Sequence, residues 1–288
     1  MPTTTVLLCV RNGAATLGRQ LAALADQDTA DDWELVLVDN GSADTTADLA
    51  RQWVPRLPRM RVLDEPLPGA NRARNRGVRA ACGEVIVCCD ADDEVAPSWL
   101  SEMTRALARF DIVGGRLEAE KLNGPFAPTA GVIQRDDLPS VFGWRYAVGA
   151  CLGFRRPVFD EGGGFDPAFG SGSDEVDFCL RAQYAGATIG FAPDAVVHYR
   201  VKHTARAVMR QRFSYGRGHQ FLVAKHARLG RIQSRPIQRW KVVAVSAAKL
   251  LEHSPDLTDR HSRLQYLASV AYLGGRVAEL LREAVTAG

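Results

Sequence analysis

Short apolar runs alternate with helical patterns along the first hundred residues. Apolar residues nearly fill four runs, at 6–10, 34–38, 60–63 and 84–89. Such runs are typical of strands that are covered on both faces. Segments patterned as helices separate them, at 14–25, 45–54 and 70–81. This alternation predicts parallel strands joined by right-handed crossovers, and therefore an open α/β sheet.

The pattern is less regular further along the chain. We expect a helix at 99–108, strands at 111–120 and 146–155, a helix at 175–184, and strands at 188–192 and 196–198. The stretch 121–145 carries Pro and Gly and is predicted to be a mobile loop. From residue 204 the chain is predicted to be helical, with breaks at Gly230 and near Pro236 and Pro255.

Composition and charge narrow the class of protein. The 288 residues are 46% hydrophobic and 24% charged, ordinary globular values that exclude wholesale disorder and a fibrous repeat. The net charge of +3 is unevenly distributed along the chain. Residues 1–197 contain 19 Lys and Arg and 28 Asp and Glu, whereas residues 198–288 contain 17 Lys and Arg and 5 Asp and Glu. We expect a cation site in the acidic part and an anionic ligand or surface for the basic part.

The compartment is predicted from cysteine usage and from targeting signals. The six cysteines form no Cys-x-x-Cys pair, so we expect reduced thiols in the core of a cytosolic protein. Threonines occupy positions 3–5, where a secretory signal would be basic. The best candidate for a membrane span, 264–281, carries Arg276 and Glu279 and is expected to be a packed amphipathic helix. The chain is therefore predicted to be cytoplasmic.

Polar clusters follow three of the predicted strands, at Arg11–Gly13, Asp39–Ser42 and Asp90–Asp93. Open α/β sheets bind their ligands at the carboxyl ends of the strands, so these clusters predict a site at one edge of the sheet. In the third cluster, alternation along an extended chain would point Asp90 and Asp92 the same way. Carboxylate oxygens joined by phosphate oxygens suit Mg²⁺ or Mn²⁺. The structural alternative is that these acids end the strand, with Asp93 or Ser98 capping the next helix.

With these motifs the chain resembles the family 2 glycosyltransferases, nucleotide-sugar enzymes of the GT-A fold, over most of residues 5–200. Six segments carry the resemblance in the family's order: Cys9–Asn12, Val38–Thr45, Ala73–Gly77, Gly83–Asp92, Gly163–Asp166 and Asp174–Arg181. The resemblance implies a Rossmann-like, mostly parallel sheet with flanking helices at 1–200 and a helical C-terminal region at 201–288. The first domain would have a donor half, about 1–110, and an acceptor half, about 111–200.

The resemblance also implies how the nucleotide is bound. Asp39 would accept a hydrogen bond from the N3–H of a uracil-like base, and Val10, Arg11 and Asn12 would line the base and ribose. A carboxylate suits an imide donor and rejects a base that presents an acceptor there. The structural alternative is that Asp39 only opens the turn that follows it.

A metal and diphosphate site is implied next to the nucleotide. Arg74 would contact phosphate or base oxygens, and Asp90 with Ala91 would contact the ribose or the metal. Asp92 would hold the ion that bridges the diphosphate, and His198 would complete its ligands. Imidazole favours Mn²⁺ over Mg²⁺. The alternative for His198 is a structural role at the end of a strand.

The acceptor side depends on Asp174 and Glu175. Members of the family usually have Glu-Asp here, with the second acid as general base on the acceptor hydroxyl, and this chain has the two acids in reverse order. By position the base is Glu175, and Asp174 is the alternative. Asp177 lies four residues before Arg181 and is predicted to form a helix ion pair with it.

Together these features predict a metal-dependent, inverting glycosyltransferase that uses a nucleotide-diphosphate sugar, UDP-linked by preference. Its acceptor would be a hydroxyl of a small molecule, a glycan or a lipid-linked molecule. Two alternatives stay open: a sugar nucleotidyltransferase, and a catalytically inactive GT-A-like scaffold or membrane-surface protein. The basic residues of 201–288 predict peripheral contact with anionic lipid at the inner face of the membrane. Nucleic acid is not expected, because no zinc-finger spacing or RNA-binding signature is present.

Overall fold

The computed structural model describes residues 3–124, 134–170, 172–252, 255 and 258–287. The chain divides into two compact units. The first unit comprises Met1–Pro167 and Glu175–Val201, and the second comprises Ala168–Asp174 and Lys202–Gly288.

The described part of the first unit is built on an eight-stranded sheet of order β3-β2-β1-β4-β9-β6-β10-β5. Its strands are β1 (Thr4–Val10), β2 (Trp33–Asp39), β3 (Arg61–Asp64), β4 (Val85–Asp90), β5 (Glu94–Val95), β6 (Ile112–Glu118), β9 (Cys151–Arg155) and β10 (Ile189–His198). β1 pairs in parallel with β2 and β4, β2 with β3, and β6 with β10, so the predicted open α/β sheet is confirmed. β9 and β5 run antiparallel to their neighbours, which the sequence pattern did not predict.

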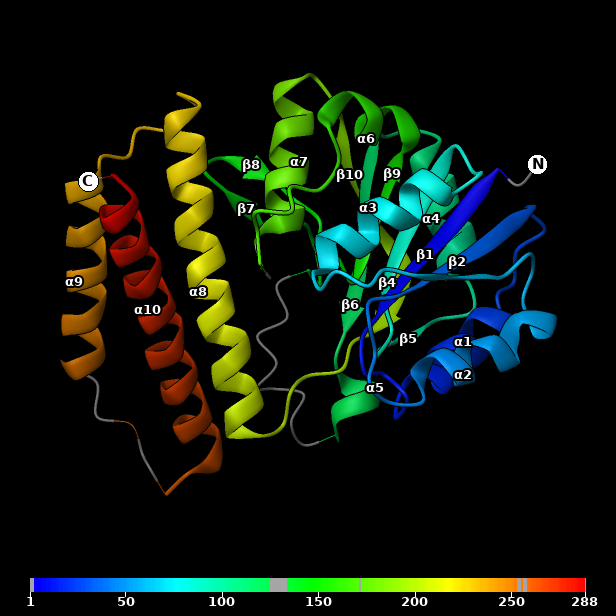
Figure 1. The fold of residues 1–288 in the computed structure, drawn as a ribbon, viewed down its shortest axis with the longest axis horizontal. Coiled ribbons are helices and arrows are strands. Elements are labelled where there is room, and N and C mark those ends of the chain that lie inside the picture. The colour runs from blue at the N-terminus through cyan, green and yellow to red at the C-terminus, as the bar shows by residue number, and fades with distance from the viewer. Residues whose placement is uncertain (1–2, 125–133, 171, 253–254, 256–257, 288) are drawn as a thin grey trace. The chain divides into compact units, whose positions relative to one another are not determined.

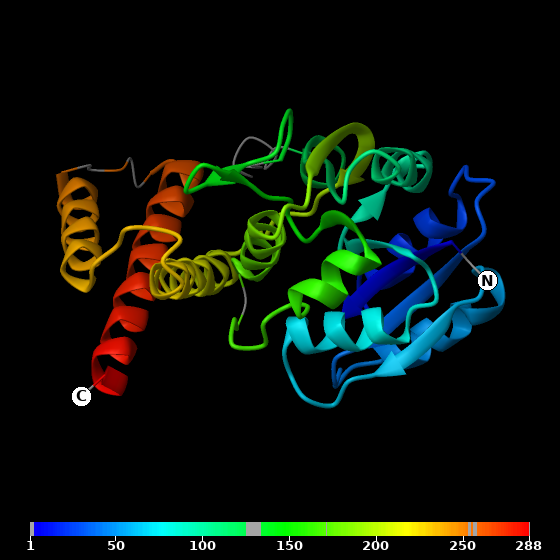
Figure 2. The same cartoon turned by 90° about the horizontal axis from the view of Figure 1, so that it is seen from above.

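Helices cover both faces of this sheet (Figures 1 and 2). One face packs against α1 (Leu17–Ala25), α2 (Thr46–Trp53), which continues into a 3₁₀ turn η1 (Val54–Arg56), and α4 (Trp99–Leu107). The other packs against α3 (Ala70–Ala80), α6 (Arg156–Gly162) and α7 (Asp174–Tyr184). The neighbours Cys88 and Cys89 lie in different cores, one under each set of helices, as strand alternation predicts.

The middle of the chain departs from the predicted pattern. A short helix α5 (Glu120–Asn123) begins at the last residue of the expected strand and continues into the expected loop. The hairpin of β7 (Ser140–Val141) and β8 (Trp144–Arg145) lies within that loop, and residues 125–133 lie outside the described residues. The expected strands at 188–192 and 196–198 form one strand, β10, because a bulge between Ala192 and Val196 keeps both parts paired with β6. The six cysteines are free thiols, but Cys82 is exposed rather than in the core.

The second unit contains three long helices in its described residues, α8 (Ala205–Arg228), α9 (Pro236–Glu252) and α10 (Arg260–Ala287). Helices α8 and α10 approach closely at two glycines. A methyl group on Gly216 would lie 1.9 Å from the backbone oxygen of Tyr272, and one on Gly275 would lie 2.0 Å from that of Phe213. In the described part of the chain, no helix is both long enough and apolar enough to cross a lipid bilayer.

This close approach predicts that Gly275→Ala lowers the free energy of unfolding of the helical unit by about 1–3 kcal/mol, the usual range for overpacking. The matched control is Gly274→Ala, whose added methyl group would meet the Phe213 ring at 3.7 Å, an ordinary contact. Urea unfolding of both variants measures the difference. Equal stability of the two variants would contradict the close crossing.

Candidate active site

The turn after β4 gathers three acids. β4 ends at Asp90, and Ala91 and Asp92 lie in a turn, so the expectation of an extended chain through Asp92 is wrong. The turn nevertheless brings the side chains together, because one carboxylate oxygen from each of Asp90, Asp92 and Asp93 lies within 4.8 Å of the others. Asp90 and Asp92 are half-buried and Asp93 is buried.

Two side chains from distant elements hold this turn. Gln20 of α1 is fully buried; its Nε2 donates to the backbone oxygen of Asp90 at 2.9 Å, and its Oε1 accepts from a backbone N–H of β5 at 3.0 Å. Arg200 follows β10, and its Nε donates to the backbone oxygen of Asp92 at 2.8 Å. The backbone N–H of Arg200 donates to Asp93 Oδ1 at 2.7 Å, so Asp93 anchors the chain after β10 instead of capping α4. The hydrogen bonds from Gln20 and Arg200 thus end on the backbone oxygens of Asp90 and Asp92.

The donor set of the turn fits a hard divalent cation, since carboxylate oxygens are what Mg²⁺ and Mn²⁺ prefer. His198 lies opposite Glu94 in the β5–β10 pairing, and its Nδ1 contacts Glu118 Oε2 at 2.5 Å. A carboxylate on one ring nitrogen orients the other, which is the usual arrangement around a metal-bound histidine. Among the described residues the close cluster holds the three aspartates, and His198 is outside it.

The loops after β1 and β2 are joined by hydrogen bonds. Asp39 is 7% exposed, and its Oδ1 accepts from the backbone N–H of Ser42 at 3.1 Å and from the Ser42 hydroxyl at 2.5 Å. These bonds hold the turn after Asp39, which is the structural alternative for this residue. Asn12 has a positive φ of 53°, and its N–H donates to Ser42 Oγ at 2.8 Å. Val10 pairs directly with Asp39, and Arg11 is exposed beside them. The four residues expected to line the nucleotide therefore lie together.

Arg74 of α3 lies near Asp90. Its guanidinium lies over the Phe165 ring, 5.5 Å from the centroid, and a methyl group on Gly149 would meet Arg74 Nη2 at 2.9 Å. Burial raises the pKa of Cys9 to about 12, the charge of Arg74 acts to lower it and the charge of Asp90 acts to raise it. The two charges therefore share one neighbourhood, and Cys9 is a neutral thiol within it.

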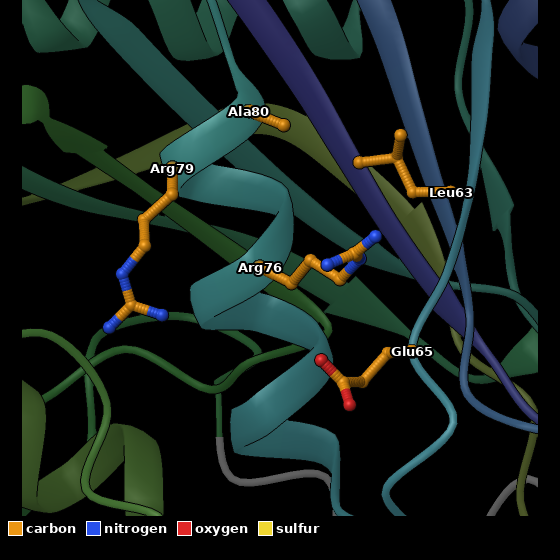
Figure 3. Close-up of a pocket in the computed structure, with 5 residues that line it drawn as sticks. All are labelled: Leu63, Glu65, Arg76, Arg79 and Ala80. Carbon is orange, nitrogen blue, oxygen red and sulfur yellow. The ribbon is translucent and has the colours of Figure 1, made fainter.

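The other arginines on α3 have different surroundings. Arg76 and Arg79 line a surface pocket of about 370 Å³ with Leu63, Glu65 and Ala80 (Figure 3). Arg76 extends toward Leu63 and Glu65, whereas Arg79 extends away from them. Residues two apart on a helix diverge, so Arg76 leaves the face that Arg74 occupies.

The acids at the start of α7 have distinct environments. Asp174 is 4% exposed, and its Oδ1 accepts from the N–H of Gly172 at 3.2 Å across a turn in which Gly172 and Ser173 have positive φ. Glu175 is half-buried. A short turn joins α7 to β10 and reverses the chain, so the two elements run in opposite directions (Figure 1). Glu175 is in the first turn of α7.

The predicted ion pair on α7 is present. Asp177 is fully buried, and Arg181 Nε donates to its Oδ2 at 2.8 Å. Arg181 also donates to the backbone oxygen of Gly164 at 2.6 Å, so the pair ties α7 to the glycine turn after α6. This ion pair gives Asp177 a structural role.

The family is decided by comparison with known sequences. The sequence model of Glycosyl transferase family 2 matches residues 5–163, and that of Glycosyl transferase family group 2 matches residues 85–275. The chain belongs to glycosyltransferase family 2. It is an enzyme that transfers a sugar, so the nucleotidyltransferase alternative is set aside.

Relatives and solved structures agree with this family. Glycosyltransferase AglE of Haloferax volcanii is 27% identical over 227 residues, covering 76% of this chain and 73% of AglE. Validoxylamine A glucosyltransferase of Streptomyces hygroscopicus is 36% identical over 110 residues, covering 38% of this chain and 26% of that relative. The mannosyltransferase PcManGT from Pyrobaculum calidifontis, in complex with GDP-Man and Mn²⁺, superposes with a TM-score of 0.71 at 20% identity, covering 97% of this chain and 87% of the other. S. aureus TarS 1–349 in complex with UDP-GlcNAc gives 0.59 at 15% identity, covering 98% and 92%. The predicted GT-A fold is confirmed.

Proposed function

We propose that this glycosyltransferase moves a sugar from a nucleotide-diphosphate donor to an acceptor hydroxyl, with inversion at the sugar and with a divalent cation. The observation that carries the proposal is the cluster of carboxylate oxygens within 4.8 Å of one another at the end of β4. Complexes of the structural neighbours with GDP-Man and Mn²⁺ and with UDP-GlcNAc support a nucleotide-sugar donor.

Asp90 and Asp92, with His198 oriented by Glu118, are the residues that would hold Mn²⁺ or Mg²⁺. When bound, such an ion neutralises the charge that develops on the departing diphosphate. Ala91 places the two carboxylates on one turn, and Arg74 supplies a fixed positive charge beside Asp90. Preorganised charges of this kind stabilise the leaving group without reorganisation during the reaction.

We assign the base of the nucleotide to Asp39, with Val10, Arg11 and Asn12 around it. Asp39 Oδ1 is engaged by Ser42, and no described residue is seen to donate to Oδ2. A single available oxygen matches the single N3–H of uracil, whereas guanine presents two adjacent donors that call for both carboxylate oxygens. A UDP-sugar is therefore the donor we propose.

The acceptor hydroxyl would give its proton to the Glu175 carboxylate as its oxygen attacks the anomeric carbon. Attack from the face opposite the diphosphate breaks the bond to the leaving group in one displacement and inverts the centre. No covalent enzyme intermediate is needed. Burial raises the pKa of Cys9 to about 12, which supports this route because that thiol is not ionised as a nucleophile at neutral pH.

A donor panel tests the proposed function. We expect nucleoside diphosphate to be released from UDP-sugars in the presence of Mn²⁺, at least about tenfold faster than from GDP-sugars, and to stop when EDTA removes the ion. Coupled detection of UDP and GDP measures both rates. Faster release from GDP-sugars would contradict the argument from Asp39. The inactive-scaffold alternative would be supported by absence of metal-dependent release with every donor.

We also propose that the second unit lies against anionic lipid at the inner face of the membrane. Helix α9 exposes apolar side chains, 51–81% accessible, together with two exposed lysines: Ile237, Val242, Val245, Leu251, Lys241 and Lys249. Apolar residues interleaved with basic ones are typical of helices that lie in a lipid interface. We expect co-sedimentation with anionic vesicles at low salt and loss of binding at high salt. Equal binding to neutral vesicles would contradict this partner.

A further inference from the structure

Arg116 lies on β6 at the level of Asp90. Leu152 of β9 pairs with Cys88 of β4 on one side and with Gly114 of β6 on the other. Since both strands are antiparallel to β9, they are parallel to each other. Asp90 and Arg116, each two residues further along, are therefore level with one another and two strand spacings apart, about 10 Å.

The two side chains project from the same face of the sheet. Cys88 and Ile112 are both buried in the core under α3, α6 and α7. Residues an even number of positions apart on a strand share a face, so Asp90 and Arg116 project toward these helices as well. Arg74 approaches from α3 on this face, because its charge acts on the pKa of Cys88 together with that of Asp90.

Among the partly buried arginines described in the first unit, Arg116 is the exception that forms no hydrogen bond with a protein oxygen. It is partly buried, and its Nε has neither solvent contact nor a hydrogen-bond partner. No described acid forms an ion pair with it. The other partly buried arginines in the described part of the first unit each donate to a protein oxygen: Arg61, Arg74, Arg145, Arg156, Arg181 and Arg200. A charged N–H group withdrawn from water without an acceptor is unfavourable, so the unpartnered Nε of Arg116 points to an acceptor that is not part of the protein.

We propose that Arg116 binds a phosphate group of the substrate. Its planar fork of donors matches phosphate oxygens, and its position faces the acids at the end of β4 across β9. The proposal rests on the proposed function, in which those acids and Arg74 hold the donor diphosphate. The phosphate that meets Arg116 comes from one of two sources, the donor diphosphate or a phosphate on the acceptor.

Equilibrium binding to Arg116→Gln tests the proposal and separates the sources. The probes are UDP and GDP with Mn²⁺, and inorganic phosphate added to enzyme already saturated with Mn²⁺ and the nucleotide. A lost hydrogen bond between charged groups predicts about 10- to 100-fold weaker binding of one probe. Arg116→Lys is expected to recover part of the loss, because it keeps the charge but not the fork. The matched control is Arg155→Gln, which removes an exposed arginine from the far end of β9 and should leave both affinities unchanged.

The outcomes are distinct. Weaker nucleotide binding assigns Arg116 to the donor, and weaker phosphate binding with unchanged nucleotide binding assigns it to the acceptor; either supports the proposal. If wild type binds the nucleotides and Arg116→Gln binds every probe equally well, the proposal is wrong and the proposed function stands. If wild type binds no probe, both are wrong. Should Arg116→Gln not fold, phenylglyoxal labelling of the wild-type peptide containing Arg116 replaces it: pyrophosphate with Mn²⁺ should protect the peptide at least about fivefold, and undiminished labelling would overturn the proposal.

Discussion

Replacing Asp92 with asparagine is expected to lower the rate of sugar transfer by about a thousandfold or more while the protein stays folded. The expected loss follows from the cluster, in which Asp92 contributes one of three carboxylate oxygens within 4.8 Å. An amide keeps the shape but removes the charge that binds a cation. A thousandfold loss corresponds to about 4 kcal/mol of transition-state stabilisation, within the range attributed to a catalytic metal ion. The turn should survive, because the substitution leaves in place the hydrogen bond from Arg200 Nε to the backbone oxygen of Asp92.

Two measurements separate this effect from damage to the fold. Release of nucleoside diphosphate with Mn²⁺ gives the rate, and electron paramagnetic resonance of Mn²⁺ in the presence of nucleotide gives metal affinity, which should fall with the rate. The matched control is Asp48→Asn, which changes an exposed acid that pairs with Arg51 on α2. That variant should transfer sugar at the wild-type rate. Normal transfer by Asp92→Asn would remove the basis of the metal site.

The parallel half of the sheet could be predicted because its signals are local. Each strand from β1 to β3 is a mostly apolar run followed within seven residues by a helix, and that spacing already implies a crossover. The antiparallel insertion of β9 between β4 and β6 could not be predicted in this way. Its pairing joins Cys89 with Cys151 and Ile112 with Phe154, contacts between segments far apart in sequence that no local pattern specifies.

In the candidate site, too, local sequence patterns predicted some residues and missed those that act through distant contacts. The acids Asp90 and Asp92 were found from their place after an apolar run, although by an argument from strand alternation that the turn after Asp90 does not follow. Gln20 and Arg200 were missed, because each acts through hydrogen bonds to the segment around this turn, 70 to 108 residues away in sequence. Arg116 was missed because its significance is the absence of an ion pair, which only three-dimensional neighbours can reveal.

Glu175→Gln is expected to retain donor binding and to lose transfer by about 10²- to 10⁴-fold, the range for removal of a general base. Glutamine keeps the size of the side chain but cannot take the proton of the acceptor hydroxyl. Nucleotide affinity in the presence of Mn²⁺ should be unchanged, because the proposed donor contacts are on other elements.

Asp174→Asn is the control for Glu175→Gln, because the two acids stand in the reverse of the usual order and either could be the base. Asp174 is buried, and its Oδ1 accepts from the N–H of Gly172. Asparagine retains that oxygen, so Asp174→Asn should keep both the turn and most of the activity. The opposite result, normal transfer by Glu175→Gln and an inactive Asp174→Asn, would move the base to Asp174. Burial favours Glu175, because Asp174 is 4% exposed and Glu175 is half-buried, so Glu175 is the more accessible of the two acids to a substrate hydroxyl.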